Sequence, residues 1–233
     1  MGRPMSEQSL RKNYDHQLQQ LHQEVTGLGI MVDKAVRKSL AALRSRDIVT
    51  AEEICDEDQW INEKRFEIEK QGLIVIATQQ PAAKDLRFLA AVLEIITELE
   101  RMGDYAKGIA RINILLDDRE DLPVPIEKLE EMAVLGLGML QRALRAFQER
   151  NVDEARIIPR EDDLVDDLYN QIFQDLIQQA GNGSSAMVRM NHILWAAHNL
   201  ERLADRVTNI CERVIFWVDG EMHELDVLDR EIR

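Results

Sequence analysis

Residues 98–106 read Glu-Leu-Glu-Arg-Met-Gly-Asp-Tyr-Ala, and residues 199–207 read Asn-Leu-Glu-Arg-Leu-Ala-Asp-Arg-Val. Both stretches contain Leu-Glu-Arg, and in both an Asp follows the Glu at position i+4, at a constant offset of 101 residues. Because an α-helix places positions i and i+4 on one face, each stretch sets two carboxylates side by side. Like charges so placed repel each other by roughly a few tenths of a kcal/mol, so the repeated pair points to a function.

The rest of the chain repeats along with this motif. Apolar residues at helical spacing predict six long helices, over about residues 9–45, 48–79, 81–117, 126–149, 152–180 and 186–218. We predict that Asp47 or Thr50 caps the second helix and that Asn151, 104 residues after Asp47, caps the fifth. Pro159 is expected to kink the fifth helix or delay its start, and Gly220 to end the sixth.

The similarity at a period of about 100 residues indicates duplication of a whole three-helix unit. Its offset falls from 104 to 101 residues across the loop before the last helix of each half, at residues 181–185 in the second half. Short connections between helices of similar length make neighbouring helices antiparallel. We therefore predict an all-α fold of two tandem antiparallel three-helix bundles, over residues 9–118 and 125–220, with a linker around residues 117–125.

The composition narrows the possible partners and compartment. The formal net charge is −14, which argues against nucleic acid as a ligand and favours cations or basic protein surfaces. No apolar run approaches the roughly 20 residues that a transmembrane helix needs, and no secretory signal is visible at the N-terminus. Cys55 and Cys211 lie far apart in apolar patterns, so we expect two buried free thiols in a reducing compartment.

The second and fifth helices add further acids to the repeated pairs. Asp162 and Asp166 are spaced i, i+4, and subtracting 104 gives Asp58 and Asn62 in the first half. If adjoining helix faces bring them together, the carboxylates converge on one spot in each half, and a cation or protons must neutralise them. The candidate ligands are then Asp58, with the Asn62 position, Glu100 and Asp104 in the first half, and Asp162, Asp166, Glu201 and Asp205 in the second.

The oxygen-only ligand set narrows the type of metal. None of the five histidines lies within these motifs, which favours magnesium, manganese, calcium or iron over a structural zinc site. His198 is nearby and is a possible pH-sensitive group. Arg101 and Arg202 are expected to neutralise nearby acids or bind a phosphate-like anion, and the three tryptophans to be core or interface anchors (Trp60, Trp195 and Trp217).

At this point the sequence resembles a known family. Residues 80–87 together with 98–106, and residues 199–205 together with 208–212, closely resemble the two repeats of the PhoU family of bacterial phosphate-signalling proteins. The resemblance covers essentially all of residues 9–220. It implies two tandem three-helix bundles whose Glu/Asp-x-x-x-Asp motifs hold multinuclear metal clusters, with iron, manganese or magnesium favoured over zinc.

The resemblance also implies a function and assigns metal ligands by position. The metal ligands would be Asp58, Glu100, Asp104, Asp162, Asp166, Glu201 and Asp205. Asn62 departs from the family pattern, so we expect the first site to bind metal more weakly or with fewer ions.

The resemblance implies a non-enzymatic adaptor that represses both phosphate uptake and the phosphate-starvation response. Members of the family act between the ATPase subunit of the phosphate ABC transporter (PstB-like) and the sensor histidine kinase (PhoR-like). The resemblance implies a cytoplasmic homodimer that associates with the membrane only through its partners.

Two alternatives come from other functional classes. Four carboxylates around two metal ions can activate water, as in a carboxylate-bridged metal oxidase or hydrolase. The absence of histidine from the motifs and the position of the acids beside the core argue against that reading. A helical scaffold without metal is the second alternative, and a protein that carries no ion and gains no stability from manganese or iron would favour it.

Overall fold

The structure, a computed structural model, describes residues 7–116, 124–179, 184–222 and 225. Within these ranges it is helical and contains no strand. In chain order the helices are α1 (Glu7–Ser45), α2 (Ile48–Gln79), α3 (Ala83–Leu115), α4 (Ile126–Glu149), α5 (Val152–Ile157), a 3₁₀ turn (Ile158–Glu161), α6 (Asp162–Gln179) and α7 (Ser184–Asp219). The predicted linker and the predicted loop at residues 181–185 lie largely outside the described residues.

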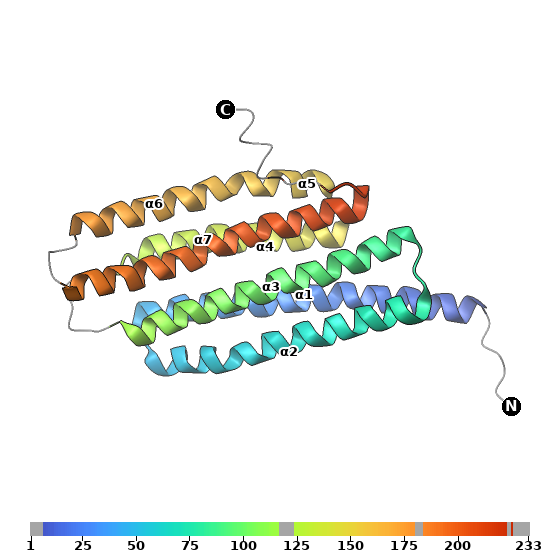
Figure 1. Ribbon diagram of the computed structural model, residues 1–233, viewed down its shortest axis with the longest axis horizontal. Helices are drawn as coiled ribbons and strands as arrows, with labels where there is room; N and C mark the ends of the chain where they lie inside the picture. Colours follow the sequence, from blue (N-terminus) through green and yellow to red (C-terminus); the bar gives the residue numbers. More distant parts are fainter. Residues whose placement is uncertain (1–6, 117–123, 180–183, 223–224, 226–233) are drawn as a thin grey trace.

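The helices form two bundles side by side along the long axis of the molecule (Figure 1). Helices α1, α2 and α3 pack on one another, and α7 packs with α4, α5 and α6. The bundles meet mainly through α3 and α7, with a smaller contact between α1 and α4. The last helix of each bundle therefore faces the other bundle, and the all-α fold with paired three-helix bundles is confirmed.

The two caps that the sequence predicts are equivalent in geometry. Asp47 Oδ1 accepts a hydrogen bond from the backbone N–H of Thr50 at 3.0 Å, and Asn151 Oδ1 accepts one from Glu154 at 3.0 Å. Such caps satisfy backbone donors that the first helical turn leaves without a partner. Gly220 has a φ of 82° and ends α7, as predicted, because glycine enters the left-handed region without a steric penalty.

Two predicted boundaries change in the structure. Pro159 lies in the 3₁₀ turn that separates α5 from α6, which confirms the predicted disturbance at this proline and divides the predicted fifth helix in two. A proline has no N–H for the helical hydrogen bond and clashes with the preceding turn. Ser184 and Ser185 were expected in a loop, but α7 already begins at Ser184, which makes it 36 residues long.

One hydrophobic core runs through both bundles. Its members come from every long helix and include Val25, Leu99, Leu140 and Val207, all fully buried. An aromatic cluster joins the bundles near one end: the ring of His22 stacks on Phe147 at 4.4 Å between centroids and lies beside Phe88 and Trp217. Because the core is continuous, the two repeats pack as one body.

Some predicted core residues lie elsewhere. Trp217 is buried and is a core anchor, whereas Trp60 and Trp195 are exposed, so for these two only the predicted alternative of an interface anchor stands. Cys211 is buried and Cys55 is only partly buried, and both are free thiols. Helical periodicity identifies a face of each helix, but it does not say whether a neighbouring helix covers the edge of that face.

Candidate functional site

The N-terminal cluster consists of Asp58 on α2 and of Glu100 and Asp104 on α3. Helix α2 packs against α3, and the three acids lie near enough for their charges to interact. Burial raises the pKa of Glu100, and the charges of Asp104 and Asp58 raise it further. Burial likewise raises the pKa of Asp104, with Asp58 adding to the effect. The three carboxylates thus affect one another's charge, although they come from two helices.

The Asp58 side chain is occupied by partners from its own chain. Its exposed fraction is 5%, and its Oδ2 atom lies 2.8 Å from Nζ of Lys107 on α3. Asn62, one turn later on α2, donates a hydrogen bond from Nδ2 to the same oxygen at 3.2 Å. The second oxygen, Oδ1, is buried and accepts no hydrogen bond. A lysine ammonium therefore contacts the carboxylate that the sequence predicted as a metal ligand.

The C-terminal cluster consists of Asp162 and Asp166 on α6 and of Glu201 and Asp205 on α7. Burial raises the pKa of Glu201, and the charges of Asp205 and Asp166 raise it further. The charge of Asp166 on α6 therefore acts on Glu201 of the α7 motif across the contact between the two helices. Asp162 lies one turn before Asp166 on the same helix, and its Oδ1 atom is buried.

One histidine lies next to the C-terminal cluster. His198 Nδ1 is 3.0 Å from Oε2 of Glu201, and the charge of His198 lowers the pKa of Glu201. This oxygen of Glu201 is buried and accepts no hydrogen bond. The sequence placed His198 outside the motif, three residues before Glu201, and a helix turn brings the two side chains together.

The duplication identifies residues that the motif search missed. Four cationic side chains act on the N-terminal cluster: Arg65 and Arg101 lower the pKa of Glu100, and Lys107 and Arg111 lower that of Asp104. The counterpart of Arg101 is the basic Arg202, which lowers the pKa of Glu201. At the offsets of 104 and 101 residues, the counterparts of the other three are Tyr169, Thr208 and Glu212, and none of these is basic. Aligning the two halves outside the motif would have revealed this difference from the sequence alone.

The residues differ in how well they fit a metal ion. Within the described residues, no group of three or more His, Cys, Asp or Glu side chains is already arranged to hold one. In the C-terminal cluster, a buried oxygen of Glu201 without a hydrogen bond beside two further carboxylates fits a hard cation. In the N-terminal cluster, the contact between Lys107 and Asp58 fits a metal ion poorly, because the ammonium already neutralises that carboxylate.

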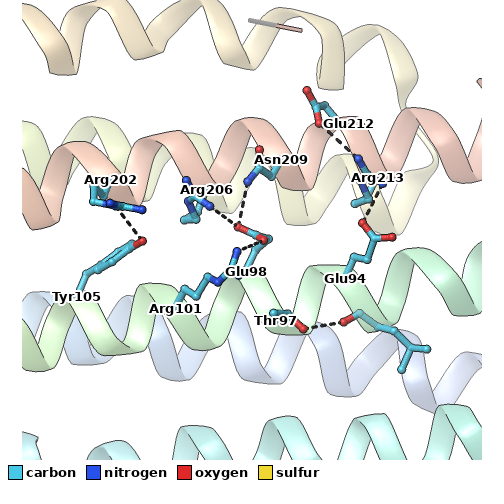
Figure 2. Close-up of polar contacts among 11 residues, drawn as sticks. Glu94, Thr97, Glu98, Arg101, Tyr105, Arg202, Arg206, Asn209, Glu212 and Arg213 are labelled. Carbon is cyan, nitrogen blue, oxygen red and sulfur yellow. Dashed lines mark hydrogen bonds and ion pairs between the residues drawn. The ribbon is translucent and has the colours of Figure 1, made fainter. Parts of the chain in front are cut away.

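A buried glutamate connects the two bundles between these clusters. Glu98 on α3, 9% exposed, accepts hydrogen bonds from Arg206 at 3.3 Å and Asn209 at 3.1 Å on α7 (Figure 2). Arg101 donates to its other oxygen at 2.9 Å. This confirms that Arg101 neutralises nearby acids: it contacts Glu98 directly, and its charge also lowers the pKa of Glu100 in the cluster.

The contacts of Glu98 have pseudo-symmetric counterparts across the α3–α7 contact. Adding or subtracting 101 converts the pair Glu98 and Asn209 into Asn199 and Gly108, which also lie together: a Cβ built on Gly108 would lie 2.8 Å from Nδ2 of Asn199. The same operation converts Arg101 and Arg206 into Arg202 and Tyr105. Arg202 donates to the Tyr105 hydroxyl at 3.2 Å and lies over its ring at 5.7 Å (Figure 2). The bundles are therefore related by an approximate two-fold axis.

A cavity next to the N-terminal cluster bears on the alternative of a metal oxidase or hydrolase, which needs a substrate pocket at its carboxylates. A cavity of about 190 Å³ borders Asp58, and its lining is mainly apolar, with Met31 and Ala35 from α1 and Ile54, Trp60 and Ile61 from α2. Glu100 and Asp104 do not line it.

Among the described helices, none combines the length and the apolar character that crossing a bilayer requires.

Comparison with known proteins identifies the family. The family model described as PhoU domain matches residues 25–112 and again residues 129–214. The chain is 33% identical over 217 residues to the phosphate-specific transport system accessory protein PhoU homolog of Clostridium acetobutylicum, covering 93% of this chain and 99% of the relative. It is 30% identical to phosphate-specific transport system accessory protein PhoU of Escherichia coli K12, over 89% of this chain and 86% of that one.

A solved structure agrees with these relatives. The crystal structure of the phosphate transport system regulatory protein PhoU from Streptococcus pneumoniae superposes with a TM-score of 0.82 at 32% identity, covering 90% of this chain and 99% of that one. The agreement extends over both bundles, since the family model matches each of them once. The duplicated Glu-x-x-x-Asp motif, the paired bundles and these relatives together establish that the chain belongs to the PhoU family.

Proposed function

We propose that this protein is a non-enzymatic regulator that represses phosphate uptake and the phosphate-starvation response. It would act in the cytoplasm as a homodimer, between the ATPase subunit of a phosphate ABC transporter and a sensor histidine kinase. The observation that carries this proposal is membership of the PhoU family over both bundles, with relatives named as accessory and regulatory proteins of phosphate transport.

We further propose that the C-terminal cluster binds a hard metal ion such as manganese, iron or magnesium. Asp162, Asp166, Glu201 and Asp205 would supply its oxygen ligands. The buried Glu201 oxygen that accepts no hydrogen bond supports this assignment, as does the shift that Asp205 and Asp166 impose on the Glu201 pKa. A bound divalent cation would supply positive charge where several carboxylates otherwise repel each other.

The physical mechanism follows from where these charges lie. The continuous core and the Glu98 contacts hold the two bundles as one rigid body. Ion binding at one place on this body would change the charge that it presents to a partner protein. The formal net charge of −14 attracts basic partner surfaces to the protein as a whole. The bound ion would change the charge locally, at the place where a partner docks.

The regulatory role is tested in the organism that carries the gene. Deletion is expected to raise phosphate uptake and to switch on phosphate-starvation genes in phosphate-rich medium, and the intact gene should restore repression. Purified protein is expected to bind the transporter ATPase in a direct binding assay. Unchanged uptake and reporter expression in the deletion strain would overturn the regulatory proposal.

The metal proposal is tested by ion content. Glu201→Ala combined with Asp205→Ala is expected to remove bound metal from protein purified without chelator, with helicity retained by circular dichroism. Asp163→Ala combined with Asp167→Ala is the matched control, because it removes two exposed acids at the same spacing from α6. Equal metal content in the cluster variant and the parent, measured by elemental analysis, contradicts the assignment.

A further inference from the structure

The N-terminal cluster combines its three acids with cations of the same chain. Lys107 Nζ lies 2.8 Å from Asp58 Oδ2. The positive charge of Arg65 lowers the pKa of Glu100, and that of Arg111 lowers the pKa of Asp104. Asn62 adds a neutral hydrogen-bond donor at the position where the second half has Asp166. Each of these residues supplies a positive charge or a donor, and none adds a carboxylate.

The corresponding positions of the C-terminal half have different chemistry. Asn62, Arg65, Lys107 and Arg111 become Asp166, Tyr169, Thr208 and Glu212 at the same offsets. An ion pair outside the clusters is retained in both halves: Lys38 pairs with Glu57 at 3.0 Å, and its counterpart Arg142 pairs with Glu161. Around the N-terminal cluster, by contrast, three basic residues have no basic counterpart.

We infer that Lys107 is the built-in cation of the N-terminal cluster, which is a structural ion pair and not a metal site. The inference uses the proposed function only in taking a hard cation as the natural ligand of such carboxylates. A divalent ion at Asp58 would have to displace the ammonium or lie beside it, and like charges at that distance repel. Displacement is costly because Asp58 is 95% buried and its ion pair would be broken.

The position of Lys107 on the helix explains how it reaches Asp58. Asp104 and Lys107 are three residues apart on α3, so their side chains lie on the same face. Gly103 allows α2 to approach α3 closely here: a Cβ built on it would lie 3.0 Å from Ile61 Cδ1 and 3.7 Å from Asp58 Oδ1. This close packing of α2 on α3 brings Asp58 within reach of the lysine and leaves its carboxylate buried.

The test removes the built-in cation and asks whether a metal ion replaces it. The background is the chain with Glu201→Ala and Asp205→Ala, stripped of metal and titrated with Mn²⁺. Adding Lys107→Thr, which installs the residue of the second half, is expected to create one Mn²⁺ site. Saturating Mn²⁺, at about 100 times the Kd, should then raise the Tm by roughly 5–10 °C.

Matched variants separate the built-in cation from general effects. Lys107→Arg keeps the positive charge and should gain no Mn²⁺, whereas Lys107→Gln should behave like Lys107→Thr. Adding Asp58→Asn to Lys107→Thr should abolish the new site. Circular dichroism of each metal-free variant establishes that it is folded, and the Gln variant provides the test if the Thr variant does not fold.

Two outcomes overturn the inference. One is Mn²⁺ binding in the background that Asp58→Asn removes, because the cluster would then be a metal site with Lys107 in place. The other is the absence of any gain in folded Lys107→Thr and Lys107→Gln. A parent that binds no Mn²⁺ contradicts the metal part of the proposed function, and a gain on removing Lys107 still supports this inference.

Discussion

The N-terminal and C-terminal clusters occupy equivalent places in two copies of one bundle, yet they differ in how their charge is balanced. In the first, Lys107 contacts the buried Asp58 directly. In the second, the residue equivalent to Lys107 is Thr208, and its buried hydroxyl neither donates nor accepts a hydrogen bond. The repeated backbone and core fix where the acids lie, while single neighbouring residues decide what neutralises them. Equivalent motifs in a duplicated protein therefore need not have equivalent chemistry.

The largest expected effect on stability comes from removing Lys107, the cation that the N-terminal cluster has and the C-terminal cluster lacks. Lys107→Met should destabilise the metal-free protein by about 2–3 kcal/mol, because it leaves the carboxylate of Asp58 buried without its ion pair. This loss of stability is smaller than for a fully buried ion pair because the Lys107 side chain is 25% exposed. Urea unfolding without metal measures it.

The counterpart substitution gives the contrast. Thr208→Val should change stability by less than about 1 kcal/mol or increase it, because it removes a buried hydroxyl that makes no hydrogen bond. Equal losses in Lys107→Met and Thr208→Val would show that the two positions have the same role. The asymmetry between the clusters would then be limited to residue identity.

A second prediction compares the two ends of the α3–α7 contact. Glu98→Gln should cost roughly 1.5–2 kcal/mol, because the buried carboxylate accepts charged hydrogen bonds from Arg101 and Arg206. Its counterpart Asn199 donates to the carbonyl of Trp195 in its own helix, so Asn199→Ala should cost about 0.5 kcal/mol or less. Thermal unfolding of both variants tests the difference, and a smaller loss for Glu98→Gln than for Asn199→Ala contradicts it.

A third prediction concerns how tightly the helices approach beside each cluster. Gly103 faces Ile61 in the first half, and the counterpart pair in the second half is Ala204 and Val165. Gly103→Ala alone should cost about 1 kcal/mol, since overpacking outweighs the gain in helix propensity. Combined with Ile61→Val, it should cost about 1 kcal/mol less than the sum of the single changes.

A double-mutant cycle by denaturant unfolding measures this coupling. The expected sign is favourable, because the smaller valine vacates the space that the new methyl group requires. Strict additivity of Gly103→Ala and Ile61→Val would mean that the two side chains do not limit the approach of α2 to α3.

The smallest expected effect is the pH dependence of stability that His22 contributes in the first half. Burial lowers the pKa of His22, and the charge of Arg150 lowers it further. The unfolded chain therefore binds this proton first as the pH falls, so the contribution of His22 is intact above about pH 6.5 and is lost as the pH falls toward its folded-state pKa. The counterpart residue is Ile126, which does not titrate.

Comparison of the parent with His22→Leu isolates this contribution. Between pH 7 and pH 5, the parent should lose more stability than the variant, measured as the change in the free energy of unfolding. Acids with raised pKa values, such as Glu201, act in the opposite direction and are common to both proteins. A steeper loss in the variant would contradict the sign derived for His22.

Much of the fold could be predicted from local patterns. Helix spans, the Asp47 and Asn151 caps, the interruption at Pro159 and the end at Gly220 follow from periodicity and turn chemistry. These signals act within a few residues, so they are readable along the chain. The motif spacing predicted paired carboxylates on one helix face, and in the structure the packing of α2 on α3 and of α6 on α7 lets acids of neighbouring helices act on one another's charge.

The sequence by itself determined the duplicated helices and the faces on which their acids lie. Tertiary structure alone decided which cations reach those acids, that Glu98 is buried at the junction of the bundles, and that Trp60 and Trp195 are exposed. The physical reason is that hydrogen bonds within a helix depend on nearby residues. The contact between Lys107 and Asp58 depends instead on the distance and rotation of two packed helices, which core side chains such as Ile61 set.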